Sequence, residues 1–212
     1  MTNLYILRHG ETEWNLQRRI QGHLDSNLTA LGSAQAEALS RAFASIKIHA
    51  LYCSDLGRAV QSVHPLEKIS GQKAILKTCL RESNLGIFQG KTSEEIKINN
   101  AEEYDLFKAR DLDYVIPEGE SLRQRHDRVV TCLEEIADFH RNETVAVMTH
   151  GGVLDSLLRF VLNIPLNSPR QFSIYNASIN SFVKDEHGWH LLTWGEISHL
   201  NGLSVINPKV GA

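Results

Sequence analysis

Two strand-like runs constrain the fold most, because each is followed directly by His-Gly. Residues 4–7 (LYIL) precede Arg8 and His9, and residues 143–149 (ETVAVMT) precede His150. Short, mainly apolar runs are typical of strands that are buried on both faces of a parallel sheet. Ligands bind at the carboxyl ends of such strands, where the connecting loops separate. The pattern therefore predicts an α/β fold in which adjacent parallel strands bring His9 and His150 face to face.

The rest of the chain predicts helices and strands in alternation. Thr29 is a good N-cap for a helix over 30–45, and the buried run 50–54 is followed by a helix that Ser54 or Asp55 would cap. Further along, the pattern predicts a strand over 74–77, one or two charged helices over 92–110, a helix over 122–140 with a capping box of Ser121 and Gln124, a helix over 153–162, and two strands within 172–195 joined at His187-Gly188.

Composition narrows the class of protein. A chain of 212 residues with 42% hydrophobic content can bury one substantial core, so we expect a single domain over 1–212. The net charge is −3 and the charges are interspersed, which argues against a nucleic-acid partner. No apolar run approaches the roughly 20 residues of a membrane span, and the N-terminus shows no signal-peptide pattern. We therefore expect no membrane partner and a cytoplasmic location.

The cysteines and histidines show no pattern of a cross-link or a metal site. Cys53, Cys79 and Cys132 are odd in number and scattered, so we expect three reduced thiols in the core. None of the ten histidines shows the close pairing that a zinc site requires. We therefore expect no metal ligands.

Residue type and position alone make four side chains candidates for a catalytic or anion-binding role. Arg8 offers a planar fork of donors that matches phosphate, and His9 can be a neutral nucleophile near pH 7. Arg58 stands in the first turn of its predicted helix, where a cation opposes the helix dipole, so we expect an anion near it. Glu82 lies among apolar residues and is either an exposed loop acid or a buried one that would hold a proton.

Five phrases along the chain resemble one family. They are LRHGETEWN at 7–15, SDLGRAVQS at 54–62, LRESNLGIFQG at 80–90, PEGES at 117–121 and THGG at 149–152. In this order they resemble the motifs of the histidine phosphatase superfamily, the phosphoglycerate mutase-like proteins, with Ser62 where the family motif has Thr. The resemblance implies a three-layer α/β/α fold with a mostly parallel central sheet and a catalytic pocket at the carboxyl ends of its strands.

The resemblance also implies the roles of the site residues. His9 would be the nucleophile, Glu82 the general acid and then base, and Arg8, Arg58 and a protonated His150 would hold the phosphoryl group without a metal or other cofactor. Asn15, Gln21, Gly22 and Gly151 would complete phosphate and substrate binding. We expect a partial lid at about 84–118, and an activity that is greatest at mildly acidic to neutral pH because Glu82 and His150 both start protonated.

Hydrolysis is the favoured reaction. The chain resembles the branch of phosphatases that need no cofactor, and it lacks the Arg-rich insertion and the Tyr-Gly-x-x-x-G-Leu-Asn-Lys phrase of the cofactor-dependent mutases. A small phosphorylated metabolite is the expected partner. The alternatives are a phosphoglycerate mutase that uses 2,3-bisphosphoglycerate and a non-catalytic scaffold that senses phosphate. The sequence leaves the natural substrate and the formation of a homodimer open.

Overall fold

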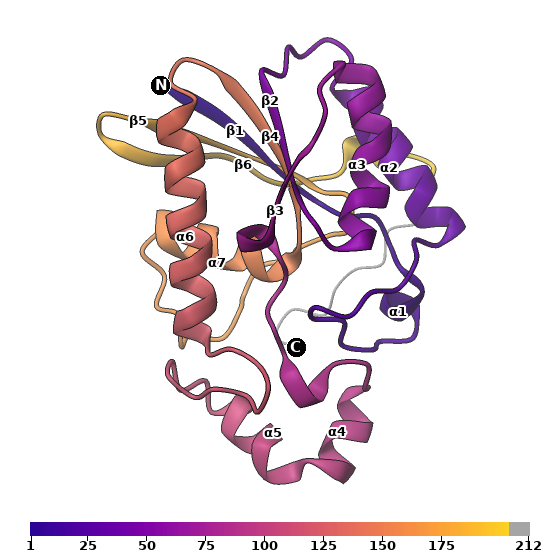
Figure 1. Cartoon of the computed structure of the whole chain (residues 1–212), viewed down its shortest axis with the longest axis vertical. Helices are drawn as coiled ribbons and strands as arrows, with labels where there is room; N and C mark the ends of the chain where they lie inside the picture. Colours follow the sequence, from indigo (N-terminus) through magenta and orange to yellow (C-terminus); the bar gives the residue numbers. More distant parts are fainter. Residues whose placement is uncertain (204–212) are drawn as a thin grey trace.

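The structure, a computed structural model, describes residues 1–203 (Figure 1). Within them one six-stranded sheet has the order β3-β2-β4-β1-β5-β6. Its strands are β1 (Thr2–Arg8), β2 (Ala50–Ser54), β3 (Ile75–Lys77), β4 (Thr144–Thr149), β5 (Ile179–Asp185) and β6 (Gly188–Glu196). The first four run parallel to one another. At one side of the sheet, β5 is antiparallel to β1 and β6 is antiparallel to β5. The expected mostly parallel sheet is confirmed.

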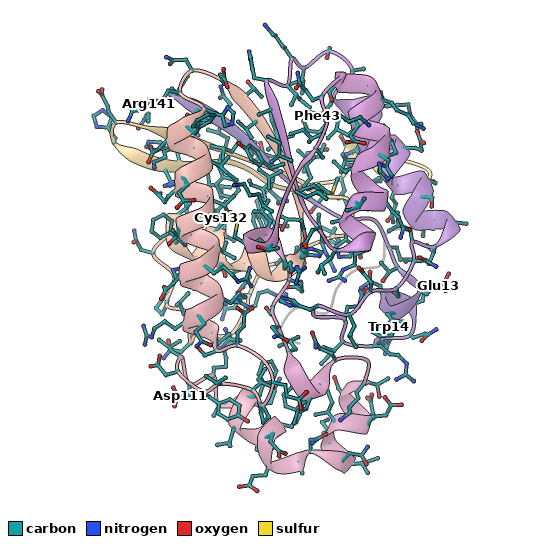
Figure 2. The ribbon with its side chains drawn as sticks, viewed as in Figure 1. Glu13, Trp14, Phe43, Asp111, Cys132 and Arg141 are labelled. Atoms are coloured by element: carbon teal, nitrogen blue, oxygen red, sulfur yellow. A yellow bond between two sulfur atoms is a disulfide. The ribbon has the colours of Figure 1, made fainter. Side chains whose placement is uncertain are left out.

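Helices cover both faces of the sheet. The longer ones are α2 (Ala30–Ala42), α3 (Gly57–Ser70), α6 (Leu122–Phe139) and α7 (Gly151–Val161). Alternate residues of β4 point to opposite faces, so that Val145 and Val147 join the core under α6 and α7, whereas Ala146 and Met148 join the core under α2 and α3. Phe43 and Cys132 accordingly lie on opposite sides of the sheet (Figure 2). The three-layer architecture is confirmed.

The observed N-caps of the helices show which capping predictions are correct. Thr29 caps α2 by accepting a hydrogen bond from the Gly32 amide, and Ser121 and Gln124 form the expected capping box of α6. The prediction for α3 is wrong, because its N-cap is Leu56 and no local side chain caps it. The carboxylate of Asp25, more than thirty residues earlier, accepts the amide hydrogens of Gly57 and Arg58 instead. A contact between distant segments has replaced the local cap.

A separate group of short elements lies beyond the carboxyl ends of the parallel strands (Figure 1). It comprises η2 (Gly86–Phe88), α4 (Ser93–Asn99) and α5 (Ala101–Lys108), and the other short elements are α1 (Glu13–Leu16), η1 (Thr78–Leu80) and η3 (Ser198–Leu200). Phe88, Ile96 and Ile116 form a small apolar cluster that is distinct from the two cores at the sheet. The sequence predicted one or two charged helices over 92–110, and the structure has two, α4 and α5.

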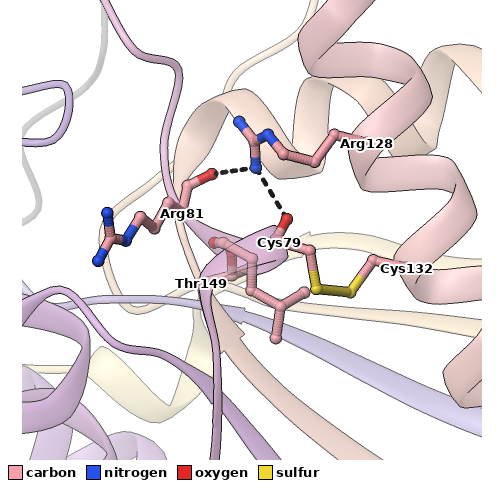
Figure 3. The surroundings of a disulfide bond; sticks show 6 residues. Cys79, Arg81, Arg128, Cys132 and Thr149 are labelled. Carbon is pink, nitrogen blue, oxygen red and sulfur yellow. Dashed lines mark hydrogen bonds between the residues drawn. A yellow bond between two sulfur atoms is a disulfide. The ribbon is translucent and has the colours of Figure 1, made fainter.

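The expectation of three free thiols is wrong for two of them. Cys79 in η1 and Cys132 in α6 form a disulfide, and only Cys53 remains a buried free thiol among the described residues (Figure 3). Spacing could not reveal this pair, because the fold brings together two segments that are 53 residues apart. Arg128, also on α6, donates to the carbonyl oxygens of Cys79 and Arg81 at 2.8 and 3.1 Å. The segment that leads to Glu82 is therefore tied to α6 in two ways.

Within residues 1–203, no helix combines the length and the apolar character needed to cross a membrane.

Candidate active site

The two histidines meet at the carboxyl ends of β1 and β4. These strands are parallel neighbours, and Arg8 pairs with Thr149 in the register, so the residues that follow them lie side by side. The ring centroids of His9 and His150 are 5.1 Å apart, and both side chains are almost fully buried. The juxtaposition predicted from the two strand-plus-His-Gly runs is confirmed.

The hydrogen bonds of His9 determine which ring nitrogen can react. Its Nδ1 lies 2.7 Å from the carbonyl oxygen of Gly10. A carbonyl can only accept, so Nδ1 carries the hydrogen and Nε2 carries the lone pair. Burial lowers the pKa of His9 well below its ordinary 6.5, and the nearby Arg58 and Arg8 lower it further. The ring is therefore neutral near pH 7, with a nucleophilic nitrogen at Nε2.

His150 differs from the expectation that it is protonated. Burial lowers its pKa well below 6.5, and Arg58, His9 and Arg8 lower it further. Its Nε2 lies 2.7 Å from the Ser54 hydroxyl, which already accepts the Leu56 amide hydrogen. The hydroxyl has one hydrogen and two lone pairs, so it can donate to Nε2 while it accepts the Leu56 amide, and in that tautomer Nδ1–H is a donor. Without a bound anion, the positive charge of the site comes from arginine and not from His150.

Two arginines supply that charge. Arg8 donates to the carbonyl oxygen of Ile174 at 2.5 Å, and its pKa is lowered to about 10, first by burial. Arg58, only 1% exposed, donates to the carbonyl oxygen of Gly22 at 2.7 Å and forms an ion pair with Asp25 at 2.9 Å. Asp25 is thus an anion beside the start of α3, as the dipole argument requires, although it belongs to the chain itself.

Three buried donors around the histidines have no partner within residues 1–203. They are Nε of Arg8, Nε of Arg58 and Nδ1 of His150. Buried polar atoms are normally hydrogen-bonded, because an unpaired one loses its bonds to water without compensation. An anion with several oxygen atoms would accept hydrogen bonds from all three. The arrangement suits a tetrahedral oxyanion such as a phosphoryl group.

Glu82 approaches this place from the segment after η1. Its carboxylate accepts hydrogen bonds from the amides of Ser83 at 2.7 Å and Gly152 at 3.0 Å, so it lies at the N-terminus of α7. A Cβ on Gly152 would lie 2.1 Å from Oε1 of Glu82, so the glycine lets the carboxylate approach the start of α7 this closely. The side chain is half-buried, between the two alternatives that the sequence left open.

The remaining predicted residues surround the arginines and the histidines. Gly22, at φ +57°, holds Arg58 through its carbonyl, and a Cβ there would collide with Gln89. Asn15 accepts the Thr12 amide and the side-chain amide of Asn176, which also donates to the carbonyl oxygens of His9 and Gly10. Gln21 is buried and accepts from the Ser26 hydroxyl at 3.3 Å.

A cavity of about 230 Å³ begins at Glu82 and Gly151 and extends toward α5. Its walls include the apolar side chains of Leu85, Phe107, Tyr114, Ile116 and Leu122, and three arginines, Arg110, Arg125 and Arg170. The phosphoryl position therefore has a chamber beside it that is large enough for the remainder of a small molecule.

Sequence reasoning missed several of these residues. Ser54 was interpreted only as a cap, although its place at the carboxyl end of β2 was a usable signal. Asp25, Asn176 and Arg170 lie in loops without periodicity, and nothing in the sequence pointed to them.

Comparisons with known proteins agree with the motifs. A family model described as the histidine phosphatase superfamily, branch 1, matches residues 4–197. Phosphoglycerate mutase-like protein 4 of Arabidopsis thaliana is 37% identical over 212 residues, which cover 98% of this chain and 91% of that one. The structure is similar to YhfR of Bacillus stearothermophilus, with a TM-score of 0.87, 32% identity, and 94% and 100% of the two chains covered. It is also similar to the phosphoserine phosphatase of Entamoeba histolytica in complex with 3-phosphoglyceric acid, with a TM-score of 0.84, 26% identity, and 94% and 100% covered.

Proposed function

Because this chain belongs to branch 1 of the histidine phosphatase superfamily, we propose that it hydrolyses a small phosphomonoester through a phosphohistidine at His9. The observation that carries the proposal is a neutral His9 ring with its lone pair at Nε2, beside Arg8, Arg58 and His150, each of which has a buried donor without a partner within residues 1–203. An enzyme that attacks phosphorus needs such a nucleophile and such a clamp.

The reaction proceeds in two steps. In the first, Nε2 of His9 attacks phosphorus, an N–P bond forms, the ester P–O bond breaks, and protonated Glu82 gives its proton to the leaving alkoxide. In the second, water attacks phosphorus while the Glu82 carboxylate takes its proton, the N–P bond breaks, and orthophosphate leaves. Arg8, Arg58 and Nδ1–H of His150 stabilise the charge on the phosphoryl oxygens in both steps.

A mutase is the second candidate, and one observation favours it. The sequence argument for hydrolysis depended on the absence of the cations that a mutase uses to hold the second anionic group of its substrate. The cavity nevertheless contains Arg110, Arg125 and Arg170, which come from other parts of the chain. These arginines are cations of the kind that the sequence argument took to be missing, and they favour the mutase as the second candidate.

The test is a screen of phosphorylated metabolites for released phosphate, together with an assay that converts 3-phosphoglycerate to 2-phosphoglycerate in the presence of 2,3-bisphosphoglycerate. We expect phosphate release that exceeds isomerisation and that survives EDTA. Isomerisation that exceeds hydrolysis would establish the mutase instead. Binding of phosphorylated compounds with no turnover would establish a phosphate-sensing scaffold.

The phosphohistidine is tested by rapid quenching with a ³²P-labelled phosphomonoester. We expect acid-labile label on His9, and a loss of roughly 10⁴-fold or more in kcat for His9→Ala. His190→Ala, which removes an exposed histidine, is the matched control. Full activity of His9→Ala would exclude the mechanism.

A further inference from the structure

The segment that precedes β5 lies against the main chain at His9. β5 runs antiparallel to β1, so the residues just before β5 lie beside those just after β1. The Arg8 amide donates to the carbonyl oxygen of Ser178 at 3.2 Å, and the Ala177 amide donates to that of His9 at 3.1 Å. The parallel neighbour β4 thus brings a second histidine to this place, and the antiparallel neighbour brings the segment 174–178.

The side-chain amide of Asn176 in this segment faces three oxygen atoms. Its Nδ2 lies 3.1 Å from the carbonyl oxygen of His9, 3.2 Å from that of Gly10 and 3.3 Å from Oδ1 of Asn15. The two carbonyl oxygens can only accept hydrogen bonds, so the nitrogen end of the amide must face them and not the oxygen end. Asn176 is therefore a donor to the main chain of residues 9 and 10.

The carbonyl group of Gly10 links Asn176 to the imidazole of His9. Its oxygen accepts from Nδ1 of His9 at 2.7 Å and from Asn176 at the same time, which its two lone pairs allow. The Glu11 amide, at the other end of the same peptide unit, donates to Oε1 of Gln35 at 2.9 Å. Asn176 and Gln35 thus hold the two polar atoms of one planar peptide.

The orientation of this peptide determines the tautomer of His9. A neutral imidazole has one hydrogen for its two ring nitrogens. With the Gly10 carbonyl in place, the hydrogen is on Nδ1 and the lone pair is on Nε2. If the carbonyl turned away, either nitrogen could carry the hydrogen, and a ring with its hydrogen on Nε2 has no lone pair there to attack phosphorus. A group that holds the Gly10 carbonyl therefore controls the fraction of molecules with a reactive Nε2.

The backbone at Ala177 shows that the fold imposes the position of Asn176. Ala177 has a φ of +53°, in the left-handed region that residues with a Cβ rarely adopt. Such a conformation persists where the surrounding structure fixes it, and such residues cluster at functional sites. Here the side chain of Ala177 is fully buried, its amide donates to His9, and its carbonyl oxygen lies 3.0 Å from Nε2 of His199. Three contacts therefore fix the turn that directs Asn176 toward His9.

We propose that Asn176 is a positioning residue for the nucleophile: by holding the Gly10 carbonyl, it keeps the hydrogen of the His9 ring on Nδ1 and the lone pair on Nε2. The inference rests on the proposed function, because it takes Nε2 of His9 to be the atom that attacks phosphorus. Asn176 acts through the Gly10 carbonyl and takes no proton itself.

Nitrogen NMR of the whole protein measures the tautomer directly. In ligand-free protein labelled with ¹⁵N-histidine, near pH 7, a ring nitrogen that carries a hydrogen and one that carries a lone pair resonate in separate regions. Comparison with His9→Gln assigns the signals of His9. We expect the wild type to carry its hydrogen on Nδ1 and Asn176→Ala to show a mixture of both tautomers. Asn176→Gln, which keeps the amide donor, should restore part of the wild-type pattern.

Kinetics measure the consequence for the reaction. We expect Asn176→Ala to lower kcat about 10- to 100-fold, because misplacing a reacting group has effects of this size and Gln35 still holds one end of the peptide. The loss should be equal with an alkyl phosphate and with p-nitrophenyl phosphate, since Asn176 acts on the nucleophile and not on protonation of the leaving group. Glu82→Gln, in contrast, should distinguish the two substrates.

A control and a second variant make a negative result decisive. Asn201→Ala removes an exposed asparagine and should leave the tautomer and kcat unchanged. If urea unfolding shows that Asn176→Ala does not fold, Asn176→Asp replaces it, because aspartate keeps the volume and its carboxylate cannot donate. The wild-type tautomer in the folded variant, whether or not kcat falls, would overturn the role of Asn176.

The spectra separate this inference from the proposed function, because they require no turnover. A mixed tautomer in Asn176→Ala, in a protein that hydrolyses no phosphomonoester, would support the hold of Asn176 on the ring and refute the hydrolase. Hydrolysis by the wild type, together with an unchanged tautomer in Asn176→Ala, would support the hydrolase and refute the role of Asn176.

Discussion

The two ends of the proposed substrate site are built differently: the histidines and arginines at the strand ends form one, and the cavity beyond Glu82 forms the other. The phosphate end, formed by Arg8, His9, Ser54, Arg58 and His150, sits directly on the carboxyl ends of central strands or on the first turn of α3. Its side chains are held by main-chain carbonyls, as His9 is by Gly10 and Arg58 by Gly22. The substrate end, formed by residues 84–118 with Arg125 and Arg170, has its own small apolar cluster outside the main cores. The first end is therefore anchored on the sheet and the second on a smaller cluster, and under the proposed function the first would position the reacting groups and the second would contact the rest of the substrate.

Glu82 lies at the junction of the two ends, and after that of His9 its substitution should have the largest effect. We expect Glu82→Gln to lower kcat by about 10² to 10⁴ with an alkyl phosphate, whose leaving group needs a proton. The loss should be smaller with p-nitrophenyl phosphate, whose leaving group needs none. Glu94→Gln, an exposed glutamate in α4, is the control. Equal losses with both substrates would remove Glu82 from the role of general acid.

Gly152 tests how tightly the phosphate end holds Glu82. Gly152→Ala would place a Cβ 2.1 Å from Oε1 of Glu82 and 2.8 Å from the Ser83 hydroxyl, so the carboxylate must move. A displacement of about 1 Å at a reacting group can cost on the order of 10²-fold in rate, and we expect a loss of roughly 10- to 100-fold. The same change in the Glu82→Gln background should cost much less. Additive losses would show that Gly152 acts independently of Glu82.

The buried histidines of the phosphate end should make the fold sensitive to acid. The pKa values of His9 and His150 lie well below 6.5 when folded, so below pH 6.5 the unfolded chain binds protons that the folded chain does not. Stability should then fall as the pH drops from about 6.5 toward the folded pKa, by up to about 1.4 kcal/mol per pH unit for each histidine.

Urea unfolding at several pH values measures this slope. His150→Gln should reduce it, and His187→Gln, which replaces an exposed histidine, is the control. A slope that is the same in wild type and His150→Gln would contradict the burial of a neutral ring.

A substitution in the substrate end should weaken substrate binding and leave the reaction at His9 intact. Ile96 is fully buried in the cluster of α4, and truncation of such a side chain costs about 2–5 kcal/mol. Because part of the population would then lack the ordered segment, we expect Ile96→Ala to raise KM roughly 3- to 10-fold, with little change in the label trapped on His9. Ile98→Ala is a matched control, because Ile98 is 81% exposed two residues away. A fall in kcat as large as that of Glu82→Gln would contradict the division between the two ends.

Much of the fold and part of the site could be predicted because their signals are local. The runs before His9 and His150 specify strands, and a strand end in a parallel sheet fixes where the next side chain lies. The caps at Thr29 and Ser121 are likewise contained within four residues. The Asp25 cap of α3 and the Cys79–Cys132 disulfide could not be predicted, because each joins segments that are distant along the chain.

The sequence by itself determined the parallel sheet, the meeting of His9 with His150, and membership of the family. The tertiary structure alone decided that burial disfavours the expected protonated form of His150, that Nε2 of His9 carries the lone pair, and that Arg110 and Arg170 line one cavity. Periodicity and capping depend on neighbours along the chain, which a sequence displays. The charge state of a buried group depends on how much water packing removes and on which charges it brings close, and only the folded chain specifies both.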